Sequence, residues 1–136
     1  MQNLPTNKSV FDLDQNVAAG LAYLPVCLCH FIVSIGILVS DKTNKLPRFH
    51  AVQSLLISGS IFVGAIVAVV LMMIFGVIAA VAQAPGIMLL SFLIYFGFLA
   101  FVLACMVGLV ISMINAFQGK IFKLPVLGNM ADKWSN

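Results

Sequence analysis

The feature that most constrains this fold is a long stretch, from Phe49 to Gly119, that holds no Asp, Glu, Lys or Arg. One short segment, Gln83-Ala84-Pro85-Gly86, interrupts its apolar character and is typical of a tight turn. In the whole chain 62% of the residues are hydrophobic and 8% are charged, whereas soluble domains carry about a quarter charged residues. A chain of 136 residues cannot bury that much apolar surface within itself. The sequence therefore predicts an all-α integral membrane protein.

We expect three membrane-spanning helices, over about residues 16–39, 55–84 and 86–117. They form a single membrane domain, 16–136, which follows a polar N-terminal segment, 1–15. At about 1.5 Å per residue, each stretch is long enough to cross about 30 Å of hydrocarbon. Pro25 in the first stretch removes a backbone donor and favours a kink. The two later stretches exceed a straight crossing, so we expect them to tilt, bend or project beyond the bilayer.

The distribution of cations predicts how the chain is oriented. Three spans place the 40–48 loop and the 120–136 tail on one side of the membrane, and Lys8 alone on the other. Because cytoplasmic loops carry an excess of Lys and Arg, we expect the loop and the tail in the cytoplasm and the N-terminus outside. The cations make no basic stripe, so we expect no nucleic acid partner. Those of the loop and tail are Lys42, Lys45, Arg48, Lys120, Lys123 and Lys133.

Small residues recur at four-residue spacing in the second and third spans. Residues four apart share one face of a helix, and small side chains there let two backbones approach closely in lipid. We expect these two spans to form a tight antiparallel hairpin through such faces; in the alternative, one face meets a partner subunit. The second span contributes Ser60, Gly64 and Ala68, and the third contributes Ala100, Ala104, Gly108 and Ser112.

The tail is apolar from Ile121 to Leu127 apart from Lys123, and Trp134 follows it. Tryptophan is enriched at headgroup level, and lysines are attracted to anionic lipids. We therefore expect an amphipathic tail, 120–136, that lies on the cytoplasmic surface of the bilayer.

His30 lies well inside the first predicted span, where a neutral histidine has two alternative roles. One is a hydrogen bond to a facing carbonyl or hydroxyl, and the other is ligation of a tetrapyrrole metal. The cofactor candidates are chlorophyll, haem and lipid, with His30 as the candidate ligand. Cys27, Cys29 and Cys105 lie in apolar stretches and are interpreted as small buried residues. No acid accompanies either histidine within a span, so no Ser-His-Asp unit is expected and we predict that the protein is not an enzyme.

Two segments resemble a known family of small bacterial membrane proteins. Residues 48–54, R-F-H-A-V-Q-S, are similar to its R-F-H-A-x-Q-S stretch. Residues 119–128, G-K-I-F-K-L-P-V-L-G, are similar to its G-K-x-F-K-L-P-x-x-G close. That family is related to the twenty-kilodalton component of the chloroplast inner-envelope import translocon, the Tic family. The resemblance implies a helical protein of a bacterial cytoplasmic, or inner, membrane.

Both segments lie on the predicted cytoplasmic side. We expect their polar side chains to meet at the cytoplasmic end of the hairpin, where hydrogen bonds between helices fix the helix register. The alternative is a binding surface for a lipid headgroup or a partner protein. The candidate residues are Arg48, His50, Gln53, Ser54, Asn115, Gln118, Lys120, Lys123 and Pro125.

Three functions follow as alternatives. The first is a non-enzymatic accessory or structural subunit of a larger membrane protein complex, with the lipid bilayer and other membrane subunits as its partners. The second, implied by the resemblance, is a component of a protein-translocation or transport assembly. The third is a subunit of a photosynthetic or respiratory complex in which His30 holds a tetrapyrrole.

Overall fold

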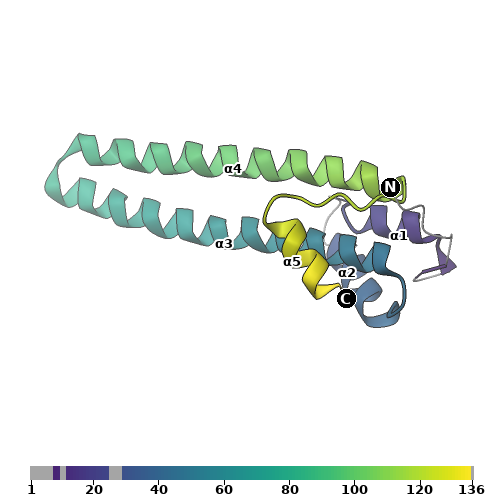
Figure 1. The fold of residues 1–136 in the computed structure, drawn as a ribbon. Coiled ribbons are helices and arrows are strands. Elements are labelled where there is room, and N and C mark those ends of the chain that lie inside the picture. The colour runs from purple at the N-terminus through teal and green to yellow at the C-terminus, as the bar shows by residue number, and fades with distance from the viewer. Residues whose placement is uncertain (1–7, 10–11, 25–28, 136) are drawn as a thin grey trace. The chain divides into compact units, whose positions relative to one another are not determined.

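The computed structural model describes residues 8–9, 12–24 and 29–135. These residues contain helices and an isolated bridge between Lys8 and Asp14, and they contain no strand. The prediction of an all-α fold is therefore confirmed. In chain order the helices are α1 Gln15–Leu21, α2 Cys29–Ser40, α3 Lys45–Ala82, α4 Pro85–Phe117 and α5 Leu127–Trp134 (Figure 1).

The first predicted span, 16–39, is not one helix in the described part of the chain, and three spans are not confirmed. After α1 the backbone closes tightly, with Tyr23 N donating to Gly20 O at 3.1 Å and Leu24 N donating to Leu21 O at 3.1 Å. A proline disfavours the helical conformation of the residue before it, here Leu24, so the helix is not expected to continue through this point. Helix α2 has 12 residues, a length of about 18 Å that falls short of the hydrocarbon thickness. The predicted kink at Pro25, like Cys27, lies outside the described residues.

Two helices, α3 and α4, are long and apolar enough to cross a membrane. Helix α3 begins at Lys45, ten residues before the predicted span, and the crossover to α4 is brief. Gln83 takes a positive φ of 50° in that turn. Pro85 then opens α4, a position where its missing N–H is harmless because a first-turn donor has no partner within the helix.

The chain divides into two compact units. We call residues 59–106 the hairpin unit, and residues 1–58 with 107–136 the polar unit. The four acids and seven cations of the chain all belong to the polar unit, so the hairpin unit carries no Asp, Glu, Lys or Arg.

In the hairpin unit, α3 and α4 run side by side in opposite directions (Figure 1). The less exposed positions recur every three or four residues on each helix, which marks the side on which the two helices pack. On α3 these positions include Ile61, Gly64, Ala68, Met72, Phe75 and Ala79, and on α4 they include Ile87, Ser91, Ile94, Phe98, Val102 and Cys105.

The outer surface of the hairpin unit is apolar. Phe62, Val63 and Leu93 are among many large hydrophobic side chains exposed there. Only 6% of the most apolar window of α3 and 11% of that of α4 is buried, whereas the core helix of a soluble protein would be mostly buried. Such a surface is stable when lipid covers it.

The polar unit has a small core of its own. Ala18 and Ala22 pack with Ile37 of α2 and Ala51 of α3 in one cluster. In a second cluster, Phe49 and Val52 of α3 pack against Ala131, which fastens α5 to α3. These clusters position the polar groups described next.

Candidate functional site

The centre of the polar unit is a network of buried polar side chains around His50. The His50 ring is fully buried, and its Nε2 lies 3.0 Å from the carbonyl oxygen of Lys120. Because a carbonyl can only accept, Nε2 carries the proton. Nδ1 lies 3.0 Å from the hydroxyl of Tyr23 and accepts its proton. These contacts fit one neutral tautomer of His50 with both ring nitrogens satisfied.

Gln53 connects the rest of this network. The two hydrogens of its amide nitrogen are shared among three acceptors, the Tyr23 hydroxyl at 3.1 Å, Ser112 Oγ at 3.0 Å and the Phe122 carbonyl at 3.2 Å. Its Oε1 accepts from the backbone N–H of Leu124 at 3.4 Å. One side chain therefore ties the segment after α1, helix α4 and the 120–124 backbone to α3.

A second set of polar contacts joins α2 to α3. The hydroxyls of Ser34 and Ser54 are 2.9 Å apart, and Ser34 also donates to the carbonyl of Ala22 at 3.5 Å. One turn further along α3, His30 Nε2 lies 3.0 Å from Ser58 Oγ. The side of α2 that packs on α3 is thus its hydroxyl-bearing side, and aliphatic side chains occupy the exposed side.

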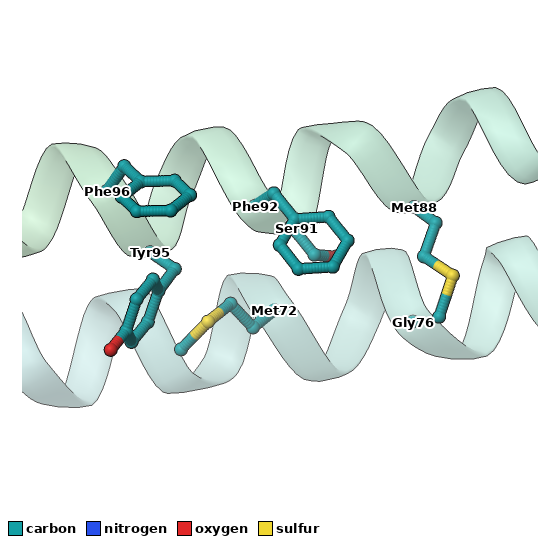
Figure 2. A pocket seen from close by; sticks show the side chains of 7 residues that line it. All are labelled: Met72, Gly76, Met88, Ser91, Phe92, Tyr95 and Phe96. Carbon is teal, nitrogen blue, oxygen red and sulfur yellow. The ribbon is translucent and has the colours of Figure 1, made fainter.

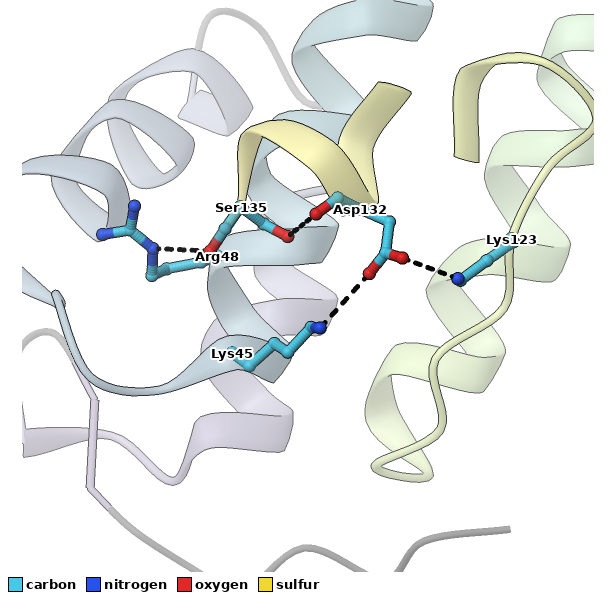
Figure 3. A network of polar contacts seen from close by, with 5 residues as sticks. All are labelled: Lys45, Arg48, Lys123, Asp132 and Ser135. Atoms are coloured by element: carbon cyan, nitrogen blue, oxygen red, sulfur yellow. Dashed lines mark hydrogen bonds and ion pairs between the residues drawn. The ribbon is translucent and has the colours of Figure 1, made fainter. Parts of the chain in front are cut away.

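Ionic contacts fasten α5 to the start of α3 (Figure 3). Asp132 receives Lys123 Nζ at 2.8 Å and Lys45 Nζ at 3.4 Å, and Arg48 Nε donates to the carbonyl of Ser135 at 3.1 Å. The hydrogen bond from Lys123, opposed by partial burial and reinforced by Lys45, lowers the pKa of the Asp132 carboxyl below its ordinary value.

Asp41 organises the turn between α2 and α3. Burial alone would raise its pKa, but hydrogen bonds from Ser9 Oγ at 2.6 Å and from Asn44 outweigh burial and lower it. Asn44 Nδ2 also donates to the carbonyl of Lys8 at 3.1 Å. These contacts hold Lys8 and Ser9 beside the 40–48 loop. The predicted orientation, with the N-terminus outside and the loop in the cytoplasm, stays a prediction.

The hairpin unit contains a groove of about 440 Å³ (Figure 2). Met88 of α4 reaches toward α3 beside Gly76, and Phe92 lies over the same gap. The hydroxyl of Ser91 is buried in this groove, and it has no hydrogen-bond partner in the described part of the chain. The lining residues are Met72, Gly76, Met88, Ser91, Phe92, Tyr95 and Phe96.

Comparison with known proteins identifies the family. The sequence profile of the Magnetosome magnetite crystal formation protein family matches residues 14–131, which is most of the chain. This chain belongs to that family. It is also 32% identical, over 130 residues, to the UPF0132 membrane protein of Methanocaldococcus jannaschii, and the match covers 94% of each chain. No solved structure matches.

The inferred relationship to the Tic import translocon was wrong. The family profile and the methanogen relative place the chain in the magnetite crystal formation family, and neither links it to protein import. The two quoted segments are features of this sequence, but they do not identify a translocon.

In this family member, the first motif and the second motif meet, but through different atoms than expected. His50 and Gln53 bind the backbone of residues 120–124, and Ser54 binds Ser34 of α2. The side chains of Asn115 and Gln118 do not join the network. Asn115 Nδ2 donates to Ile111 O within its own helix at 2.8 Å, and Gln118 Oε1 accepts from Lys120 Nζ at 2.7 Å.

Pro125 opens a strained turn before α5. Its carbonyl accepts from Leu127 N at 2.8 Å, and the residue between them, Val126, has a φ of 66° and a ψ of −63°. These values define a γ-turn, which is rare for a β-branched residue.

The small residues predicted to form the hairpin faces have different environments. A Cβ added at Gly64 would meet the rings of Phe98 at 3.3 Å and Phe101 at 3.4 Å, and Ala68 is buried on the same side of α3, as Ser60 is in part. On α4, a Cβ at Gly108 would meet Leu124 at 3.1 Å, and Ser112 binds Gln53. Ala100 and Ala104 are exposed, so the structure does not bring them against α3.

The geometry at His30 favours the structural alternative over a tetrapyrrole. Nε2 already faces Ser58, and the ring lies against Phe31 with 4.0 Å between ring centroids. Nδ1 is buried and has no partner among the described residues, and the tetrapyrrole alternative stays a prediction. Across the same residues, no group of three His, Cys, Asp or Glu side chains is arranged to hold a metal ion.

Two parts of the network were not predicted from the sequence: Tyr23 and the backbone groups of residues 120–124. Tyr23 is almost wholly buried, and a buried tyrosine hydroxyl needs hydrogen-bond partners. The available signal was a tyrosine two residues before a proline in an apolar stretch, which indicates a polar contact near a helix end.

Proposed function

We propose that this protein is a non-enzymatic membrane component that acts as an accessory subunit in the magnetite crystal formation for which its family is named. In this role it docks a helix of another membrane protein in the groove of the hairpin unit. The observation that carries the proposal is the buried Ser91 hydroxyl, which has no partner among the described residues. A hydroxyl in a lipid-covered groove gains a hydrogen bond when a polar group of a neighbouring helix meets it.

The lining of the groove supports a helix as the occupant. Nothing lies within 4 Å of a Cβ added at Gly76, so a second backbone has room to approach there. Met72 and Met88 are flexible side chains that adapt to an incoming surface. A glycine beside a polar side chain is the usual chemistry of contacts between membrane helices.

The proposal includes a topology with two crossings. Helices α3 and α4 span the membrane, and residues 15–40 enter one leaflet as α1, reverse, and return to the same side as α2. The contacts of Ser9 with Asp41 and of Asn44 with Lys8 support this reversal. So does the outer side of α2, where Ile32, Ile35 and Val39 are exposed.

Charge supports the same topology. All seven cations then lie on the side of the polar unit, and the turn at Gln83 carries none. By the excess of Lys and Arg in cytoplasmic segments, the polar unit is cytoplasmic and the turn faces the opposite compartment.

Single cysteines test the topology. In a background without native cysteines, Lys8→Cys, Thr43→Cys and Lys133→Cys should react with an impermeant maleimide from the cytoplasmic side only. Gln83→Cys should react from the opposite side only. Labelling of Lys8→Cys together with Gln83→Cys would restore a third crossing and refute the reversal.

Co-purification tests the docking role. The tagged protein, extracted gently from native membranes and examined by native-gel mass spectrometry, should carry another membrane protein at fixed stoichiometry. Gly76→Leu with Ser91→Ala should release that protein. Gly97→Leu is the matched control, because Gly97 also has nothing within 4 Å of an added Cβ but does not line the groove. A protein that migrates alone, or equal retention by all variants, would reject the proposed role.

A further inference from the structure

A second groove, of about 330 Å³, lies within the polar unit. Its lining is apolar and comes from α2, α3 and the end of α5. Trp134 is 55% exposed and contributes the aromatic part of that lining. The lining residues are Leu38, Val52, Leu55, Leu56 and Trp134.

A cation lies on the same side of α3 as this groove. Lys45, Val52 and Leu56 are seven and four residues apart, so they share one face of the helix. At about 1.5 Å per residue, Lys45 precedes Val52 by about 10 Å along the helix axis. A phospholipid presents a negative phosphate followed by an apolar acyl chain. A cation followed by an apolar groove complements these two parts in the same order.

The positive charge beside the groove is not fully neutralised. Asp132 is shared between Lys45 and Lys123 (Figure 3). Both lysine side chains are about half exposed. Lys133 adds a further exposed cation next to Trp134. Two lysines with one carboxylate leave a net positive charge that an anionic headgroup complements.

Helix α5 presents an apolar surface beside Trp134. Val126, Met130 and Trp134 are four residues apart and all are exposed, whereas Gly128 and Ala131 form the buried side of the helix. The γ-turn holds Val126 at 71% exposure, so the strain at this residue displays an aliphatic side chain rather than burying it. An exposed apolar stripe flanked by lysine is typical of a helix that lies at a membrane surface.

We infer that the groove of the polar unit binds one acyl chain of an anionic phospholipid. The headgroup lies beside Lys45, and Trp134 lies at the boundary between the headgroup and the acyl chain. This inference rests on the proposed cytoplasmic-leaflet position of the polar unit. It does not depend on the docking of a partner helix in the hairpin unit, and it is tested on the purified protein alone.

The single tryptophan of the chain makes the test direct. The full-length protein is reconstituted in phosphatidylcholine vesicles that contain either brominated phosphatidylglycerol or brominated phosphatidylcholine at the same mole fraction. Bromine atoms quench tryptophan at short range, so the fluorescence of Trp134 reports which lipid occupies the groove. We expect the anionic lipid to quench Trp134 at lower mole fraction than the zwitterionic lipid.

Variants at Lys45 separate a bound lipid from the surrounding bilayer. Lys45→Gln should lower the relative affinity for the anionic lipid about fivefold, because one cation near an anionic surface contributes about that factor. Lys45→Arg should restore the preference, and the unfolding curve of Lys45→Gln shows whether loss of the Asp132 contact disturbs the fold. Lys8→Gln is the matched control, since Lys8 pairs with Asp12 at 2.7 Å and does not contact the groove.

Each remaining outcome rejects a stated part of the inference. Equal quenching by the two lipids, unchanged in Lys45→Gln, means that Trp134 meets only bulk lipid and that no headgroup site exists. Absence of quenching by either lipid places Trp134 outside the bilayer and rejects the acyl-chain site altogether. Neither result bears on the docking of a partner helix by the hairpin unit, which the co-purification experiment tests separately.

Discussion

The two units of this protein differ in the contacts that stabilise them. The hairpin unit exposes apolar side chains and needs few specific contacts, because lipid covers its outer surface. The polar unit holds most of the buried apolar side chains, and its elements are fastened to one another by side-chain hydrogen bonds that converge on Gln53 and His50. Stability in the first unit comes from helix formation and close packing, whereas the second also depends on satisfying buried polar groups.

Substitutions in the two units should therefore differ in how much stability they remove. A conservative change in the hairpin unit removes a few van der Waals contacts, which neighbouring lipid replaces. A conservative change in the polar unit leaves a buried donor or acceptor without a partner, and nothing nearby replaces it. The four predictions below test this contrast.

The largest effect is expected for Gln53→Leu. This change removes the partner of Tyr23, Ser112 and the backbone of residues 122–124, so several buried polar groups lose a hydrogen bond at once. We expect the free energy of unfolding to fall by at least about 3 kcal/mol. Unfolding in mixed detergent micelles, followed by circular dichroism, measures it.

Gln118→Leu is the control for Gln53→Leu. Gln118 is exposed and its side chain accepts a hydrogen bond from the exposed Lys120 side chain, so its loss should change stability by less than about 0.5 kcal/mol. If the two variants lose similar stability, the polar unit does not depend on its network.

The second prediction compares two tyrosines. Tyr23→Phe leaves His50 Nδ1 without its donor and should destabilise the protein by about 1–3 kcal/mol. Tyr95→Phe makes the same chemical change on an exposed residue of the hairpin unit and should have almost no effect. Thermal unfolding in one detergent distinguishes them, and a larger loss at Tyr95 would reverse the contrast between the units.

The third prediction concerns packing inside the hairpin unit. Gly64→Leu places a side chain against the rings of Phe98 and Phe101 and should cost about 1–2 kcal/mol. Gly59→Leu is matched, because a Cβ at Gly59 meets nothing within 4 Å. Equal melting temperatures for these two variants would show that α3 and α4 do not pack at Gly64.

Much of the hairpin unit was predictable from the sequence, and less of the polar unit. A long apolar stretch interrupted by one turn, at residues 83–86, predicts two long helices. In lipid the backbone N–H and C=O groups must hydrogen-bond to one another, and a helix achieves this within one segment. The described part of the first stretch forms two separate helices, α1 and α2, and hydropathy alone does not separate a crossing from two short helices.

The candidate site was predicted by residue type but not by contact. Arg48, His50 and Gln53 do meet the segment that follows α4, as expected for two polar motifs at one helix end, whereas Ser54 binds Ser34 of α2. Their partners, however, are mostly backbone atoms, which the side-chain pattern of a sequence does not reveal. Tyr23 enters the network because α1 ends at Leu21 and the backbone turns at once, and the sequence pattern did not predict a helix end there.

The smallest effect expected is that of acid, and it should act on the polar unit alone. Asp41 and Asp132 have pKa values held below their ordinary range, so their contribution to stability is fully present above the unfolded pKa of about 4. It is lost as pH falls through the lower, folded pKa values. The hairpin unit has no carboxyl group and no histidine, so its helices should persist at pH 3.

Hydrogen exchange at pH 7 and pH 3 measures this difference unit by unit. Amides around the 41–44 turn and in α5 should lose protection at pH 3, whereas amides of residues 59–106 should keep it. Asp41→Asn should already weaken protection of the turn at pH 7 and should reduce its further change with acid, because the neutral amide cannot accept as strongly from Ser9 and Asn44. Equal loss of protection in both units would mean that they unfold together, and the division into a lipid-covered unit and a hydrogen-bonded unit would then not describe their stabilities.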